Sequence, residues 1–264
     1  MTYDVIVDLF RNNSSDVAPL AIARNAIAGV TGRTFYGSSH NVGITEETIW
    51  EGSNRYVYPT AATKMKVSSS SSSDGVLGVG ARTVVVSGLD GNFVEVEEVV
   101  ILTGQAAVET INSFYRINEL RCDDVGSSGQ NVGSIYIGTG VVTAGVPTNK
   151  YGIISPLNGR TLMGLFTVPK GHTFYGRLST YNVGKNDSGE AGIYARFGAN
   201  KSWFVVDHAD ISSGQVNLDR KEFLLVAPEF TDVEIRGKAD SSNTVISGFY
   251  AGWLVDNRIV TNGT

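Results

Sequence analysis

The sequence predicts an all-β protein in which two β-sandwich domains of jelly-roll type follow an extended N-terminal arm. Three observations predict this fold class. Glycine supplies 31 of the 264 residues, well above its usual share of about 7%. Only 18% of the residues are charged, against about 25% in an average soluble domain. Short runs rich in valine, threonine and aromatic residues alternate with polar, glycine-containing turns, a pattern typical of antiparallel strands.

Residues 81–102 (ARTVVVSGLDGNFVEVEEVVIL) form the clearest hairpin signal in the chain. Valine and threonine are stiff at χ1 and suit a pleated strand, and Asp90-Gly91 readily supplies the positive φ angles of a tight turn. The second arm alternates apolar and acidic residues over Val94–Glu97, which predicts one buried and one solvated face. The doubled acid Glu97-Glu98 breaks this period, so we expect a β-bulge there.

Residues 1–44 differ in composition from the rest of the chain and are predicted to form the arm. Ala18–Val30 is the only stretch of helical composition, with proline near its start and glycine near its end, and it predicts a helix of one or two turns. We expect the arm to become ordered against a neighbouring subunit. The alternative is that it wraps around its own domain.

The two sandwiches are expected at residues 45–146 and 150–257. The boundary is placed in residues 141–150 (VVTAGVPTNK), which contain small residues, a proline and no periodic core. The six serines that end Lys64–Ser73 have the composition of a flexible linker, but the strand-like lead-in KMKV favours a serine-rich edge strand. Trp253 is expected to fill the core of the second sandwich.

Charge and cysteine content restrict the partners. The net charge of −5 disfavours a protein that holds nucleic acid through phosphate contacts. A single cysteine, Cys122, excludes an internal disulfide framework and a cysteine-rich zinc site. The N-terminus has the features of neither a signal peptide nor an anchor, and no run of about 18 apolar residues is present. We therefore expect no membrane partner and synthesis in the cytoplasm.

Two local clusters of polar residues have the chemistry of metal sites. Asp207-His208-Ala209-Asp210 is the best constellation for a metal or for acid–base work, but a solvated turn after a strand explains it more simply. Asp123-Asp124, beside the cysteine, lacks the regular spacing of calcium ligands. The chain also lacks the phosphate-loop, serine-nucleophile and zinc-helix motifs. We predict no catalytic residue, no cofactor and no metal.

Glu95 and Glu97 form the one carboxylate pair that suits an enzyme. Residues two apart on a strand share a face at about 6.5 to 7 Å, a separation found in inverting glycosidases. A solvated strand face is the simpler explanation for these two acids. A carbohydrate-active enzyme that uses these acids, or the Asp207–Asp210 cluster, is the rival to a non-enzymatic protein.

Aromatic residues gather near the end of the predicted arm and just after it. Tyrosine and tryptophan are enriched in subunit interfaces. We therefore predict that the subunit contacts involve Phe35, Tyr36, Trp50, Tyr56 and Tyr58.

Several strings, in their order along the chain, resemble one protein family. ETIW and YVYP lead into KMKVSSSSSSDGVLGVGARTVVVSGLDGNFVEVEEVVILTG, followed by TINSFYRINEL and GSSGQNVGSIYIG; the second half contributes TLMGLFTVPKGHTFYG and VEIRGKADSSNTVISGFYAGWLVDN. This order is similar to virion structural proteins of tailed bacteriophages, notably marine and cyanobacterial ones. The resemblance covers residues 44 to 257.

The resemblance implies a non-enzymatic virion component, most simply a capsid decoration or cement protein. Its expected partners are copies of itself, as a homo-oligomer and first of all a trimer, and the major capsid protein or other virion proteins. The alternative within the same class is a tail or head-fibre protein that binds host surface glycans. If residues 1–43 are an arm, their deletion is expected to leave a folded protein that no longer binds particles.

Overall fold

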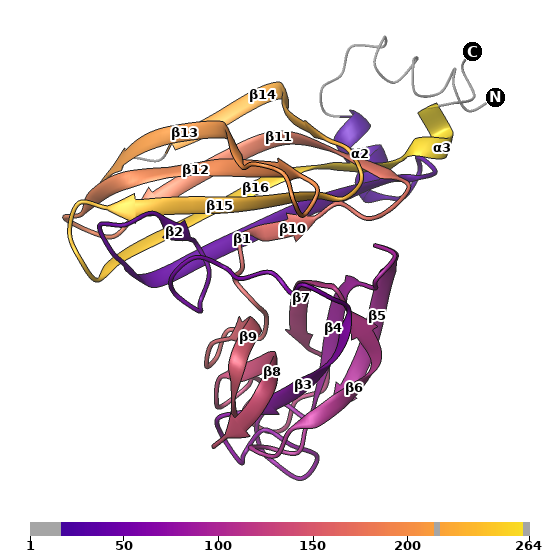
Figure 1. The fold of residues 1–264 in the computed structure, drawn as a ribbon, viewed down its shortest axis with the longest axis vertical. Helices are drawn as coiled ribbons and strands as arrows, with labels where there is room; N and C mark the ends of the chain where they lie inside the picture. Colours follow the sequence, from indigo (N-terminus) through magenta and orange to yellow (C-terminus); the bar gives the residue numbers. More distant parts are fainter. Residues whose placement is uncertain (1–16, 214–216, 261–264) are drawn as a thin grey trace.

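The computed structural model describes residues 17–213 and 217–260, and their fold is all-β, as predicted. The strands form four antiparallel sheets, and the sheets pair around two separate apolar cores (Figure 1). Within these ranges only two short helices flank them: α2 (Val17–Ala23) and α3 (Asn257–Val260). The predicted short helix is therefore confirmed in α2.

The first core lies in a unit that we call the body, residues 17–49 and 164–260. One of its sheets has the order β1-β16-β11-β14: β1 (Val30–Val42), β16 (Thr244–Asp256), β11 (His172–Val183) and β14 (Asn217–Ala227). The other has the order β10-β15-β12-β13, with β2 also paired to β15: β10 (Leu165–Thr167), β15 (Thr231–Ala239), β12 (Ser188–Phe197), β13 (Phe204–Ser212) and β2 (Glu47–Thr48).

The second core lies in the insert, residues 50–163, which emerges between β2 and β10. One sheet has the order β6-β3-β8-β9: β6 (Val108–Phe114), β3 (Thr63–Ser69), β8 (Ile135–Thr143) and β9 (Val146–Ile154). The other has the order β5-β4-β7: β5 (Glu95–Ile101), β4 (Thr83–Leu89) and β7 (Arg116–Cys122). The amide of Gly164 donates to the carbonyl of Ile49 over 3.1 Å, so the chain leaves the body and returns to it at one place.

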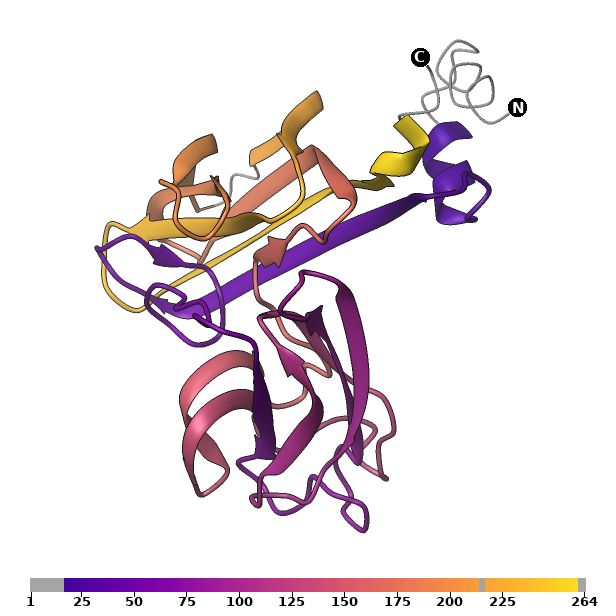
Figure 2. The same cartoon turned by 45° about the vertical axis from the view of Figure 1, so that its right-hand side comes forward.

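This division corrects the predicted domain limits. Residues 30–42 are not an arm, because β1 pairs along its length with the body strand β16. They belong to their own subunit, which was the alternative left open; residues 1–16 lie outside the described part. Because the deletion of residues 1–43 removes an entire strand of the body, we now expect it to impair folding. Figure 2 shows the helix α2 leading into the long strand β1, which runs along the yellow strand β16.

The predicted boundary at residues 141–150 is also wrong, because this stretch is the turn of the β8–β9 hairpin. Ala144 and Gly145 both have positive φ, at 48° and 79°, as a two-residue primed turn requires. Small residues here reflect a tight turn inside the insert rather than a linker.

The hairpin predicted at residues 81–102 is confirmed as β4 and β5, with two differences. The positive φ of its turn is at Phe93 (61°) and not at Asp90-Gly91. Its register contains no bulge. The alternation continues through Glu98, which points inward and is buried, and its carboxylate accepts hydrogen bonds from the amides of Ile111 and Asn112 on β6 at 2.7 and 2.9 Å. The doubled glutamate thus joins the edges of the two insert sheets.

Only the first part of the serine-rich stretch, up to Ser69, forms the strand β3, and Ser70–Ser73 lie in the loop that follows. The strand is interior rather than an edge, between β6 and β8. The side chain of Ser68 donates to the carbonyl of Gly145 over 2.9 Å, and that of Ser69 to buried Asp74 over 2.6 Å. Asp74 also accepts hydrogen bonds from the amides of Ala81, Val132 and Gly133 at 2.8 to 2.9 Å. One carboxylate therefore connects the β3–β4 loop, the β7–β8 loop and the end of β3.

Alternation along β16 decides the place of Trp253. Tyr250 and Leu254 are buried in the body core, so Trp253 lies on the opposite face, where the guanidinium of Arg177 stacks over its ring at 4.3 Å. The prediction that Trp253 fills the core is wrong.

Candidate functional site

The body and the insert meet on the charged face of β15. Its sequence alternates so that Val233 and Ile235 enter the body core, while Asp232, Glu234 and Arg236 point the other way. In a half-exposed sheet this polar face would be solvated. Here the insert and the β12–β13 loop cover it, and all three charged side chains are buried.

Guanidinium groups and aromatic rings alternate across this junction in what we call the arginine ladder. The guanidinium of Arg116, from β7 of the insert, lies 4.9 Å from the ring of Tyr58, and Arg196 of β12 lies 4.9 Å from the same ring. Trp203 lies 4.7 Å from Arg196 and 4.1 Å from Arg236, and Tyr194 continues the ladder at 4.6 Å from Arg236. Each such contact contributes about 0.5 to 2 kcal/mol, most when desolvated.

Carboxylates fix the ladder from one side. Asp232 accepts from Nε of Arg116 at 2.9 Å, from Arg196, and from the hydroxyl of Thr167 at 2.6 Å. Glu234 accepts from Nε of Arg236 and from the hydroxyl of Tyr58. The ion pair between Arg116 and Asp232 is buried on both sides, so the loss of either partner would leave an uncompensated charge.

Burial and pairing shift the pKa values of these groups in opposite directions. Burial raises the pKa of Glu234, and the charge of Arg236 offsets only part of this effect. Burial also acts to raise the pKa of Glu46, but hydrogen bonding from Tyr194 and the charge of Arg55 give a net lowering. Burial, together with the hydrogen bond to Glu46, raises the pKa of Tyr194 to about 12.

A cavity of about 390 Å³, the arginine cavity, opens beside the ladder. It lies at the junction of the two units and is rich in basic and aromatic side chains. Residues that line it include Arg55, Tyr58, Tyr115, Arg116, Arg196, Trp203, Glu234 and Arg236.

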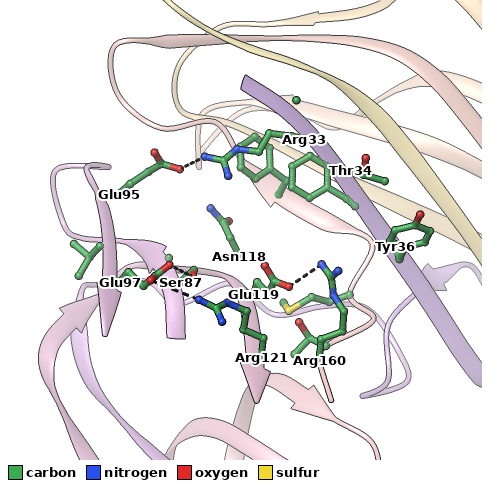
Figure 3. Close-up of a pocket in the computed structure, with 17 residues that line it drawn as sticks. Arg33, Thr34, Tyr36, Ser87, Glu95, Glu97, Asn118, Glu119, Arg121 and Arg160 are labelled. Atoms are coloured by element: carbon green, nitrogen blue, oxygen red, sulfur yellow. Dashed lines mark hydrogen bonds and ion pairs between the residues drawn. The ribbon is translucent and has the colours of Figure 1, made fainter. Parts of the chain in front are cut away.

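A second cavity, the charged cleft, has a volume of about 550 Å³ and separates β1 from the β5-β4-β7 sheet (Figure 3). Arg33 of β1 bridges it to Glu95 of the insert at 3.0 Å. On the insert side Arg160 pairs with Glu119 at 2.7 Å. These charges are paired but accessible, in contrast to those of the ladder.

The charged cleft also contains the free edge of β1. Five consecutive residues, 32–36, line it, whereas a strand face would contribute every second residue. The amide of Ser38 donates away from β16, to Leu162, so the even-numbered residues direct their backbone groups towards the insert.

Large apolar side chains are exposed at the far end of the insert, which we call the apolar tip: Val76, Leu77, Val79, Val132 and Leu157. The loops that carry them are hydrogen-bonded to one another, through the amide of Ser128 to Val79 and the amide of Leu157 to Asn131. Leu77 is 99% exposed. Clustered exposed apolar residues mark an interaction surface more often than scattered ones do.

The five predicted interface residues do not form a common surface. Trp50 and Tyr56 are buried in the insert core, with their rings 5.0 Å apart, and Tyr58 belongs to the arginine ladder. Phe35 stacks on Phe166 in the body core at 4.3 Å. For these four side chains the predicted subunit contact is replaced by contacts within the subunit.

Tyr36 is the exception among the five. It is 45% exposed on β1 and lines the charged cleft. Of the five it is the most exposed, whereas Phe35 and Tyr58 are half-buried and line the charged cleft and the arginine cavity respectively.

The predicted metal and acid–base candidates separate in space. The stretch from Asp207 to Asp210 lies within β13, not in a turn after it, so neighbouring side chains point to opposite faces. Asp207 accepts from the hydroxyls of Ser179 and Tyr181 at 2.7 and 2.9 Å, whereas His208 contacts Glu190 at 3.3 Å. No group of three or more potential ligands for a metal ion occurs among residues 17–213 and 217–260.

The remaining acids have structural partners. Asp123 and Asp124 pair with Arg121 and Arg82 at 3.7 Å. Glu97 accepts from the hydroxyl of Ser87 and lies in the charged cleft with Glu95. Neither described helix has the length and apolar character that a membrane crossing requires.

The sequence interpretation missed the arginine ladder. Its local signal was present in the alternation of DVEIRG and in the arginine and tyrosines of SFYRINEL, but alternation shows only that two faces differ. It does not show that a segment more than 100 residues away covers the polar one.

Comparisons with known proteins give no family for this chain. No protein-family model matches it, and no curated protein does. Two solved structures from infectious bursal disease virus show a weak likeness, one of the Gx strain and one of a VP2 subviral particle. Each match has 10% identity and spans 86% of this chain and 72% of the other, with TM-scores of 0.24 and 0.23. Scores this low carry no inference about this chain.

Proposed function

We propose that the chain is a non-enzymatic structural subunit of a bacteriophage virion, most simply a capsid decoration or cement protein. In this proposal the body and the insert are two β-sandwiches of jelly-roll type. The subunit acts as a homo-oligomer, with a trimer as the first expectation, and contacts the major capsid protein. The resemblance of residues 44 to 257 to phage virion proteins gives the class.

The observation that carries an assembly role is the apolar tip. Buried apolar surface contributes about 25 cal/mol per Å², so a patch of this kind gains free energy only when a partner covers it. A decoration protein repeats such a contact many times over a shell, and each copy adds a small stabilisation by mass action.

The test is cryo-electron microscopy of the virion, with the copy number of the chain measured by quantitative mass spectrometry. Hundreds of copies on the head, with the apolar tip covered, would support a decoration role. The Leu77→Asp variant is expected to fold and to lose incorporation, whereas Val205→Asp, on the edge strand β13 of the body, is the matched exposed control. Full incorporation of Leu77→Asp would contradict the proposal.

The second candidate is a tail or head-fibre protein that binds host surface glycans. The charged cleft favours it, because guanidinium, carboxylate, amide and hydroxyl groups converge there, and exposed Tyr36 lies at its margin (Figure 3). A glycan array separates the two candidates. Saturable glycan binding that Arg160→Gln abolishes, together with a few copies per particle, would favour the fibre.

A further inference from the structure

The arginine cavity contains guanidinium groups with unused donors. Arg196 directs Nε and Nη2 to Asp232, and among the described residues its Nη1 has no hydrogen-bond partner. Arg236 directs Nε to Glu234, while its Nη1 lies 3.6 Å from Glu46, beyond hydrogen-bonding distance, and no acceptor within the described ranges faces its Nη2. The side chain of Arg236 is only 3% exposed.

Ion pairs and ring contacts hold these guanidinium groups in place, so their free N–H groups remain available to an acceptor. Arg196 and Arg236 both line the cavity, so an acceptor placed there would meet them. The cavity of about 390 Å³ has room for a small ligand together with ordered water.

The charge balance of the junction also favours an anion. Four arginines, at positions 55, 116, 196 and 236, meet three carboxylates, at positions 46, 232 and 234. One positive charge is therefore left over, in a chain whose net charge is −5. In a desolvated site this excess attracts an anion more strongly than it would in water.

The aromatic rings limit the chemistry of the ligand. Tyr58 and Trp203 each already contact two guanidinium groups, so they offer no free face for stacking a sugar or a base. We infer that the arginine cavity binds a compact oxyanion, a carboxylate or phosphate group, through charge and hydrogen bonds to Arg196 and Arg236.

The test measures the thermal unfolding midpoint and the tryptophan fluorescence of the full chain at constant ionic strength. Phosphate, acetate and glucuronate are titrated separately, with chloride as the reference salt. Glucuronate shows whether a carboxylate on a sugar ring also fits. A saturable rise of about 5 °C at a hundredfold excess over Kd is expected for at least one oxyanion.

Two variants at the partly exposed rim change the excess charge in opposite directions. Arg55→Gln removes the excess positive charge of the cavity, and we expect oxyanion affinity to fall about tenfold. Glu46→Gln raises the excess to two, and affinity is expected to rise by a similar factor. Arg121→Gln in the charged cleft is the matched control and should leave affinity unchanged.

The pattern of results decides the inference. Oxyanions that act no differently from chloride would overturn it, because the shift would then reflect general salt effects. Equal effects of Arg55→Gln and Arg121→Gln would overturn it as well. The result is independent of the proposed virion role, since binding is measured on the isolated chain.

Discussion

The body and the insert use the same construction, two antiparallel sheets around one apolar core, but they differ in what they bury and what they expose. Both cores combine aliphatic side chains with a few buried rings, which are Phe166, Phe174, Tyr181 and Tyr250 in the body and Trp50, Tyr56 and Phe114 in the insert, but only the body also buries charged side chains on β15. Of the eighteen large apolar side chains exposed in the described residues, eleven belong to the insert.

This difference indicates a division of labour. The body places buried charges on the face of β15 that receives the insert, so it fixes the position of the insert. The insert leaves apolar surface at the end away from that junction, where a partner can cover it. Under the proposed function, the body would hold the insert in place and the insert would contact the partner.

Removal of the shared carboxylate should have the largest effect. Asp232→Ala leaves Arg116 and Arg196 as buried guanidinium groups without their acceptor, and we expect a loss of about 3–5 kcal/mol in the free energy of unfolding. Urea denaturation followed by circular dichroism measures it. A loss below about 1 kcal/mol would show that the junction does not hold the two units together.

A smaller and more local loss is expected inside the insert. Asp74→Ala removes the acceptor of hydrogen bonds from Ser69, Ala81, Val132 and Gly133, at a cost of about 2–3 kcal/mol. Hydrogen exchange should show faster exchange at the three amides and unchanged protection in β16 of the body. Equal loss of protection in both units would mean that they unfold as one.

The pH dependence of stability should separate the two acids of the ladder. Because the pKa of Glu234 is raised in the folded state, the native protein binds its proton more tightly, and stability falls as pH rises from about 4.5 through the raised pKa. Glu46, with a lowered pKa, contributes in the opposite sense: its stabilisation is present above its ordinary pKa and is lost as pH falls.

Unfolding free energies of Glu234→Gln and Glu46→Gln, measured across this pH range, test these signs. Glu234→Gln should remove a negative slope, and Glu46→Gln a positive one. The same slope change in both variants would contradict the assignment.

The smallest effect is expected in the charged cleft. Arg33→Gln breaks an accessible pair with Glu95, and such pairs contribute about 0.2–1 kcal/mol. The effect should shrink further at 1 M salt, where the screening length is about 3 Å. If Arg33→Gln proved as costly as Asp232→Ala, the contrast between cleft and ladder would disappear.

The fold class and several elements were predictable because they depend on neighbours in the chain. The alternation of residues 81–102 gives β4 and β5, and the composition of residues 18–30 gives α2. Local patterns carry no information on which strands pair, however, and the partner of Val30–Val42 begins at Thr244. The arm and the domain limits were wrong for this reason.

The candidate site was less predictable than the fold. Of the five aromatic residues chosen as subunit contacts, Trp50 and Tyr56 are buried within the subunit and Phe35 and Tyr58 are half-buried against its cores, since aromatic composition is the same for a core and for an interface. Arg116 gave no signal, because a single arginine in a strand normally faces water. Its burial follows only from the placement of Asp232, 116 residues later.

The hydrogen bond between Gly164 and Ile49 places both connections of the insert at one point of the body. A segment of chain inserted at such a point can be lengthened, shortened or exchanged without any change in the strand order of the body sheets. A replacement module would need its own arginine opposite Asp232 to seat correctly.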